Sequence, residues 1–206
     1  MKNNPNFIAP VGPASSGKDH LIQILKDRGY ERVSLSDSIR DDLDKLHPGR
    51  RHTRSDFQDY GDKMRLEYGN DYWAQRAGEN IEVLKRSGAT KFAIDSIRNP
   101  AEIEWFKKTY GLIAIAVDAP LELRIKWAFK RQRNIDDTIS EDNIRRDFER
   151  DLGIGQPEHG QNVRSCIEMS DQLIINDETE KELDEKLRDA LLSIGVEGNH
   201  NHREKK

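Results

Sequence analysis

The stretch "FIAPVGPASSGKDHLIQIL", residues 7–25, decides the fold because it joins two different periodicities through one glycine turn. The short apolar run before Gly12 is typical of a buried strand. After Gly17 and Lys18 the apolar residues fall on one helical stripe, which Gly29 ends. The sequence therefore predicts a strand, a tight loop and a helix in direct succession.

The loop in this stretch, Gly12–Lys18, matches the pattern G-x-x-x-x-G-K. Glycines let backbone N–H groups turn inward, and the following helix directs its positive end at the same spot. Lys18 supplies a cation for outer phosphates. An incidental glycine turn is the alternative, but the position between strand and helix favours a phosphate loop. We expect the nucleotide-binding residues here to be Gly12, Ala14, Ser15, Ser16, Gly17, Lys18, Asp19 and His20.

Asp19 stands where phosphate loops of this pattern carry a Mg²⁺-binding hydroxyl. A carboxylate is also a hard oxygen donor, so Asp19 can bind the metal directly or through water. It also adds a negative charge beside a polyanion. We therefore expect nucleotide binding that depends unusually strongly on Mg²⁺.

The composition indicates a single globular domain of 206 residues with its core in a few apolar runs. A net charge of −4 gives no sign of a general nucleic-acid or membrane surface. The single cysteine, Cys166, excludes an internal disulfide framework and is typical of a buried apolar side chain. No signal peptide or membrane span is predicted, so we expect a cytoplasmic domain over residues 1–196 and a disordered tail over 197–206.

Strands and helices alternate along the chain, which favours an α/β fold of the three-layer P-loop NTPase type. We expect a parallel sheet with helices on both faces, whose strand ends carry the ligand site. The predicted strands are residues 6–11, 31–35, 91–95, 112–118 and 171–176. The predicted helices are residues 18–27, 37–46, 53–68, 72–85, 101–110, 120–133 and 180–194.

A charged excursion, residues 134–160, lacks a strong apolar face and is predicted to be a lid over the domain. Phosphoryl transfer has a charge-rich transition state and needs water excluded, which a lid bearing arginines achieves. At least one of Arg131, Arg133 and Arg145 is expected to reach the transferred phosphoryl group. An ordinary solvated helix is the alternative for each of them.

An acidic residue and several arginines follow the predicted strands. Asp95 ends a strand, where a metal-ordering acid belongs in a phosphate-loop enzyme, although capping of the next helix is its alternative role. Arginines around a cleft bind phosphate oxygens bidentately. The helical region 37–88 is therefore the predicted acceptor site, with the substrate-binding residues Asp37, Arg40, Arg54, Arg65 and Arg98.

The segments "GPASSGKD", "VSLSDSIRDDL", "AIDSIRNPAEIEWFK", "IAVDAPLELRIKWAFKRQR" and "LIINDET" together resemble phosphate-loop kinases of small phosphorylated acceptors. The chain is most similar to nucleoside and deoxynucleoside monophosphate kinase-like proteins, including kinase-like domains found next to deoxycytidylate deaminases. The likeness extends to about residue 194. Related kinases also carry S-G-K-D in the loop, which favours a working loop despite Asp19.

The resemblance implies a five-stranded parallel sheet, a mobile lid and ATP as donor. It implies that Arg40 contacts the acceptor phosphate and that Asn176 lies beside the donor adenine. "DSIRNP" resembles the D-G-x-P-R segment of adenylate kinases, which carries over Asp95 and Arg98. Ser96 replaces the glycine of that segment and its proline and arginine are reordered, so the acceptor's identity stays open. No zinc is implied, because the lid lacks cysteine pairs.

We expect Mg²⁺-dependent transfer from ATP to a small-molecule nucleotide, a (deoxy)nucleoside monophosphate, by a monomer or homodimer. Lys18, Asp95 and the lid arginines would act in catalysis, and Asp19 and Asp95 would hold the metal. Two alternatives stay open. One is a kinase of an alcohol or another phosphorylated metabolite such as dephospho-coenzyme A, with Asp37 or Asp95 as base. The other is a nucleotide-sensing module without catalysis.

Overall fold

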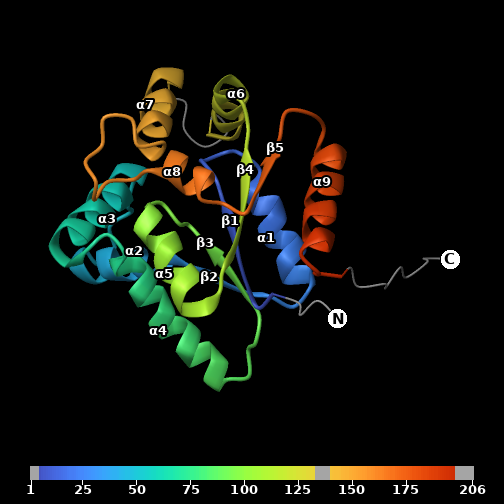
Figure 1. Cartoon of the computed structure of the whole chain (residues 1–206). Helices are drawn as coiled ribbons and strands as arrows, with labels where there is room; N and C mark the ends of the chain where they lie inside the picture. The colour runs from blue at the N-terminus through green and yellow to red at the C-terminus, as the bar shows by residue number, and fades with distance from the viewer. Residues whose placement is uncertain (1–4, 133–139, 198–206) are drawn as a thin grey trace.

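The computed structural model describes residues 5–132 and 140–197, and its centre is a parallel sheet of five strands. The strand order is β2-β3-β1-β4-β5, and all four pairings are parallel. Figure 1 shows this sheet between helices on both faces. The predicted α/β fold is therefore confirmed. The strands are β1 (Phe7–Val11), β2 (Glu31–Ser34), β3 (Phe92–Asp95), β4 (Ile113–Asp118) and β5 (Gln172–Ile175).

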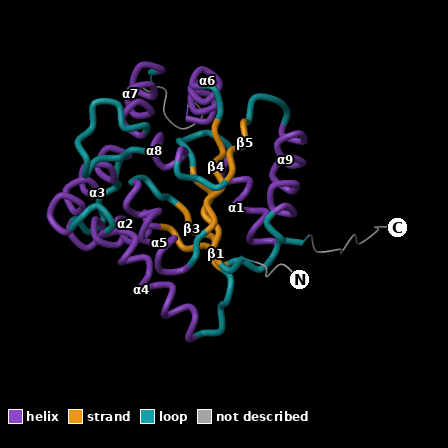
Figure 2. Tube along the Cα trace, viewed as in Figure 1, coloured by secondary structure: helices purple, strands orange, loops and turns teal. Residues whose placement is uncertain are grey.

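The central strand β1 is buried along its whole length because both faces of the sheet are covered. Phe7, Ala9 and Val11 pack with α2, α4, α5 and α8, whereas Ile8 packs with α1 and α9. Figure 2 shows these two helix groups on opposite sides of the strands. The helices of the two faces are α1 (Lys18–Asp27), α2 (Leu35–Leu46), α4 (Tyr72–Arg86), α5 (Pro100–Tyr110), α8 (Val163–Glu168) and α9 (Glu180–Ser193).

Two further helices, α6 (Leu121–Gln132) and α7 (Glu141–Asp151), pack together at the end of the sheet where the strands finish (Figure 1). Their contact is a small apolar cluster of Ile125, Ala128, Ile144 and Phe148, which also touches Ala14 of the phosphate loop. The sequence interpretation gave residues 134–160 no strong apolar face, which is wrong for α7. Ile144 and Phe148, one helical turn apart, form that face.

The second half of the predicted lid is fastened to the main domain. The Asn162 N–H donates to the Arg98 carbonyl at 2.7 Å, and the Asn99 side chain donates to the Gly160 carbonyl at 3.0 Å. These bonds tie the segment before α8 to the start of α5. Residues 133–139 and 198–206, which include Arg133 and most of the predicted tail, lie outside the described residues.

Two details of the helices differ from the sequence prediction. Helix α2 begins at Leu35, two residues before the predicted start, because Ser34 at the end of β2 takes the N-cap position. Helix α8 was not predicted, although Asn162 caps it by accepting the Ser165 N–H at 3.1 Å. The remaining helix, α3 (Arg54–Tyr68), begins one residue after the predicted start, because Thr53 takes the N-cap position and its side chain accepts the Asp56 N–H. In the described part of the chain, no helix is both long and apolar enough to cross a membrane.

Candidate functional site

The phosphate loop between β1 and α1 has a backbone that only glycine fits at two positions. Gly12 has φ +151°, and a Cβ there would lie 2.1 Å from the Val117 carbonyl oxygen of β4. Gly17 has φ +97°, and a Cβ there would lie 2.6 Å from the Asn176 side-chain nitrogen. The two glycines of the motif are therefore required by the close approach of β4 and of the residue after β5.

Asn176 braces this loop. Its side-chain N–H donates to the Ser16 carbonyl at 3.0 Å, and its backbone N–H donates to the Asp118 carbonyl at 2.7 Å. The residue predicted to lie beside adenine thus also sets the shape of the loop. It does so from the end of the edge strand β5.

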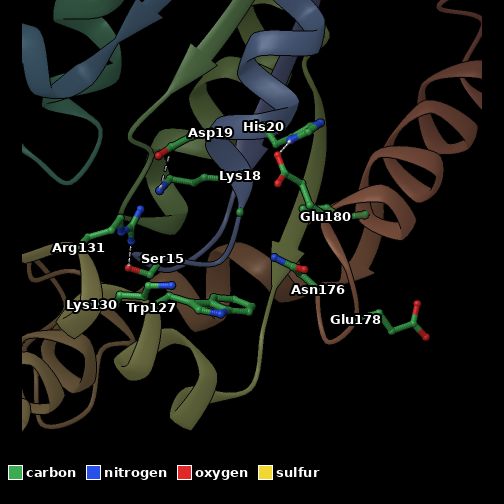
Figure 3. Close-up of a pocket in the computed structure, with 12 residues that line it drawn as sticks. Ser15, Lys18, Asp19, His20, Trp127, Lys130, Arg131, Asn176, Glu178 and Glu180 are labelled. Atoms are coloured by element: carbon green, nitrogen blue, oxygen red, sulfur yellow. Dashed lines mark hydrogen bonds and ion pairs between the residues drawn. The ribbon is translucent and has the colours of Figure 1, made fainter.

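A cavity of about 620 Å³ opens beside the loop. We name it the donor cavity. Figure 3 shows Trp127, Lys130 and Arg131 approaching the loop from α6. The Arg131 guanidinium donates to the Ser15 hydroxyl. The residues that line the cavity are Ser15, Gly17, Lys18, Asp19, His20, Trp127, Lys130, Arg131, Asn176, Glu178, Glu180 and Leu183. Its volume lies within the range usual for small-molecule sites.

Lys18 is the first residue of α1 and is only 8% exposed. Its Nζ atom lies 3.8 Å from the Asp19 carboxylate. Burial, and then the nearby positive charge of Arg98, lower the pKa of Lys18. A bound anion at this position would offset both effects on the pKa of Lys18, since an opposite charge nearby favours the charged form.

The two predicted metal ligands, Asp19 and Asp95, differ in whether their carboxylate oxygens already have partners in the protein. The Asp19 side chain is 80% exposed on the donor cavity, so it has oxygens available for a hard cation. Asp95 is engaged on both sides, because it accepts the Ser96 N–H at 2.6 Å and lies 2.9 Å from Arg32 Nη2. No group of three His, Cys, Asp or Glu side chains able to hold a metal occurs among the described residues. The donor set fits Mg²⁺ held by Asp19 together with phosphate oxygens.

His20 points away from the loop toward α9. Its Nε2 atom lies 2.9 Å from the Asp184 carboxylate, which links α1 to α9. His20 borders the donor cavity, but its nearest polar partner belongs to the helix layer.

A second, smaller cavity of about 190 Å³ lies where β2 and β3 end. We name it the acceptor cavity. It contains three of the arginines predicted to bind the acceptor: Arg54, Arg65 and Arg98. Its lining residues are Leu35, Ser36, Ile39, Arg54, Phe57, Gln58, Gly61, Arg65, Ser96, Arg98 and Gln161.

Arg65 differs from Arg54 and Arg98, which share the one carboxylate of Asp151, because it has two carboxylate partners. Its Nη2 atom lies 2.8 Å from Glu102, and its Nη1 atom lies 3.1 Å from Asp62. The residue is 3% exposed. Two carboxylates neutralise its charge, so its role in acceptor binding stays a prediction that these ion pairs do not support.

The predicted site residues that line neither of the two cavities include Asp37, Arg40 and Arg145. Asp37 is half exposed and pairs with Arg32 at 3.1 Å. The Arg40 guanidinium lies 4.9 Å over the ring of Phe57, which itself lines the acceptor cavity. Arg145 pairs with Glu122 at 2.9 Å and so joins α7 to α6.

Asp151, at the end of α7, is the site residue that sequence reasoning missed. Its side chain is fully buried and accepts the Ala14 N–H of the phosphate loop at 2.9 Å. The same carboxylate lies 3.1 Å from Arg98 and 3.6 Å from Arg54. Burial disfavours its charged form, but Arg98, Arg54 and the Ala14 N–H outweigh burial and lower the pKa of Asp151. The only sequence signal was an acid within an arginine-rich segment, and only the fold brings it to the loop.

Gln58, Gln161 and Trp127 were also not predicted as site residues. The two glutamines line the acceptor cavity and are nearly fully buried. Trp127 lines the donor cavity. Glutamine and tryptophan carry no motif spacing, so their place follows from the fold alone.

Solved structures confirm the fold type. Shikimate kinase from Acinetobacter baumannii aligns with a TM-score of 0.53 at 17% identity, over 95% of this chain and 97% of its own. A putative kinase from Chloroflexus aurantiacus aligns with a TM-score of 0.51 at 15% identity, over 92% and 97%. At these identities the likeness shows the fold of phosphate-loop kinases.

Sequence relatives show the family, although no family model matches the chain. A UPF0200 protein of Sulfurisphaera tokodaii is 31% identical over 193 residues, which cover 91% of this chain and 97% of the relative. A UPF0200 protein of Saccharolobus solfataricus is 30% identical over 192 residues, which cover 90% and 93%. The chain belongs to the UPF0200 family.

Proposed function

We propose that the protein transfers the terminal phosphoryl group of ATP to a nucleoside monophosphate, with deoxynucleoside monophosphates as the first candidates. The donor cavity would take ATP and the acceptor cavity would take the monophosphate. The fold is shared with shikimate kinase and with the putative kinase of Chloroflexus aurantiacus, which supports a kinase reaction.

The observation that carries the proposal is the position of Asp151. One carboxylate contacts the phosphate loop at Ala14 and an arginine of the acceptor cavity, Arg98, at 2.9 and 3.1 Å. The loop and that arginine are therefore separated by the width of one small anion. A phosphoryl group passing between the two cavities would need this same spacing.

The chain's own groups would then act as follows. Lys18 and the loop N–H groups would bind the outer phosphates of the donor, and Asn176 would keep the loop in shape. Arg54 and Arg98 would orient the acceptor phosphate once Asp151 moves aside. Arg131, at the loop, would stabilise charge on the transferred group. Mg²⁺ bound at Asp19 would neutralise part of the triphosphate charge.

An anionic acceptor is favoured over an alcohol acceptor by the lining of the acceptor cavity. An alcohol needs a base to remove its proton, whereas a phosphate oxygen is already ionised at neutral pH. None of the described residues that line this cavity is a carboxylate. Asp37 points to Arg32, and the lowered pKa of Asp151 makes it a poor base.

The test is a transfer assay with ATP labelled at its terminal phosphate and a panel of ribo- and deoxyribonucleoside monophosphates. Labelled diphosphate should form with at least one acceptor and should require Mg²⁺. ATP binding without transfer to any monophosphate would contradict the proposal and favour a nucleotide-sensing module. Transfer to an alcohol such as dephospho-coenzyme A would show a different acceptor class.

A further inference from the structure

Gln58 is a buried amide with one side left without a partner. It lies on α3, is 3% exposed and lines the acceptor cavity. Its Nε2 atom donates to Gln161 Oε1 at 3.2 Å. Its Oε1 atom has no hydrogen-bond partner.

A purely structural role explains only half of this arrangement. The Gln58–Gln161 bond joins α3 to the segment before α8, as a structural contact would. Buried polar atoms in folded proteins nearly always have partners, so a free Oε1 atom on a residue that lines a cavity points to a ligand. The bond to Gln161 also fixes the side chain, so that Oε1 is held in place for that ligand.

The amide presents two kinds of group side by side: the free Oε1 acceptor and the second N–H of Nε2. A partner must therefore carry a donor next to an acceptor. Nucleobase edges have this pattern, and glutamine reads it with two parallel hydrogen bonds. The hydroxyl groups of a sugar phosphate can both donate and accept, but they lack the flat, parallel arrangement of a base edge.

The rest of the cavity limits the size and the charge of the ligand. Arg54 and Arg98 provide cations for an anionic group. Phe57 and Ile39 provide apolar surface for a flat ring, and the Arg40 guanidinium covers the Phe57 ring at 4.9 Å. At about 190 Å³ the cavity is smaller than most small-molecule sites, which favours a one-ring base over a two-ring base.

We propose that Gln58, positioned by Gln161, reads the donor–acceptor edge of a pyrimidine base in the acceptor. Gln58 is thereby a specificity-determining residue, and the acceptor is a pyrimidine nucleoside monophosphate. This inference rests on the proposed function, because it takes the second cavity as the acceptor site.

The test measures binding rather than turnover. Calorimetric titration compares the wild type with Gln58→Met. The ligands are the pyrimidine nucleotides dCMP and dTMP, the purine nucleotides dAMP and dGMP, and deoxyribose 5-phosphate. Methionine matches glutamine in length and removes both hydrogen bonds. Gln58→Asn, which keeps an uncharged amide but withdraws it by one methylene, serves as a second variant if methionine lowers the melting temperature. Gln75→Met, at an exposed position of α4, is the matched control.

The expected result is that Gln58→Met weakens dCMP and dTMP binding by roughly 10- to 100-fold, the range of one bidentate amide contact. Binding of deoxyribose 5-phosphate should not change, and Gln75→Met should bind as the wild type does. Equal losses for all ligands, no loss, or a preference for purines would overturn the inference. If the Gln58 variants bind monophosphates as the wild type does and the wild type still transfers phosphoryl groups to them, this inference is wrong and the proposed function is not affected. Gln58-dependent binding without transfer would contradict the proposed function alone.

Discussion

At the scale of single residues, the phosphate loop lies so close to the neighbouring strands that only glycine fits at some of its positions. A Cβ on Gly12 would lie 2.1 Å from the Val117 carbonyl oxygen. Such contacts explain why the motif needs its glycines. The spacing of those glycines was enough to predict the loop from the sequence. The partners of the loop, Asn176 and Asp151, come from residues more than a hundred positions away. The sequence implied a place near the nucleotide for Asn176 and none for Asp151.

Asp151→Asn should lower the free energy of unfolding at pH 7 by about 3 kcal/mol, because it leaves buried arginine charge without its partner. The folded-state pKa of Asp151 is lowered, so its contribution is present above the unfolded-state value of about 4. That contribution is lost as pH falls through the lower folded-state value. Urea unfolding from pH 3 to 7 should show a weaker loss of stability in acid for the variant.

The same variant tests whether Asp151 occupies an anion site. With Asp151→Asn, added phosphate should raise the melting temperature more than it does for the wild type, because Arg54 and Arg98 are free to bind it. Asp142→Asn, at an exposed position of α7, should behave as the wild type. Equal phosphate effects in all three proteins would show that Asp151 is only a structural ion-pair partner.

Asp19→Ser removes the negative charge beside the triphosphate. Without Mg²⁺ the variant should bind ATP about fivefold more tightly than the wild type, because repulsion between the carboxylate and the phosphates is gone. With Mg²⁺ the difference should shrink or reverse, since Asp19 is then a metal ligand. Titrations with and without EDTA measure this. Equal affinity of the wild type for ATP in both conditions would contradict a role for Asp19 in metal binding.

At the scale of elements, helices with strong signals were predicted well and the segment between α6 and α8 was not. Capping residues and apolar stripes located most helices to within two residues. Helix α7 is short and highly charged, and its packing on α6 depends on Ile144 and Phe148 alone. Two apolar residues are too few to show a helical period in the sequence. For this reason the sequence analysis found no strong apolar face in residues 134–160 and predicted a lid.

Arg65 on α3 is a predicted acceptor ligand whose ion pairs do not support that role. The sequence made it an acceptor ligand, whereas the structure pairs it with buried Glu102. Arg65→Met should therefore destabilise the fold by about 3–5 kcal/mol, because Glu102 would keep an uncompensated buried charge. Urea unfolding should also show that Glu102→Gln, added to Arg65→Met, restores part of the loss. A large increase in acceptor KM with little loss of stability would instead make Arg65 a substrate ligand.

At the scale of the whole molecule, the site follows from the strand order. The chain builds one side of the sheet after β1, returns to the centre and builds the other side, so the strand order reverses at β1, whose carboxyl end leads into the phosphate loop. The alternation of strands and helices was enough to predict this place. The acceptor cavity could not be predicted, because its walls combine α2, α3 and the segment before α8 in a packing that no local pattern encodes.

The central claim is that the loop and Lys18 bind a metal-bound polyphosphate beside the acceptor arginines. The most direct measurement is calorimetric titration of Mg-ATP into the wild type, Lys18→Ala and the control Lys26→Ala, which changes an exposed lysine of the same helix. Lys18→Ala should weaken Mg-ATP binding at least about tenfold, the loss expected for one partly buried charge-assisted contact, while Lys26→Ala binds as the wild type does. Unchanged Mg-ATP affinity in a folded Lys18→Ala protein would contradict the account.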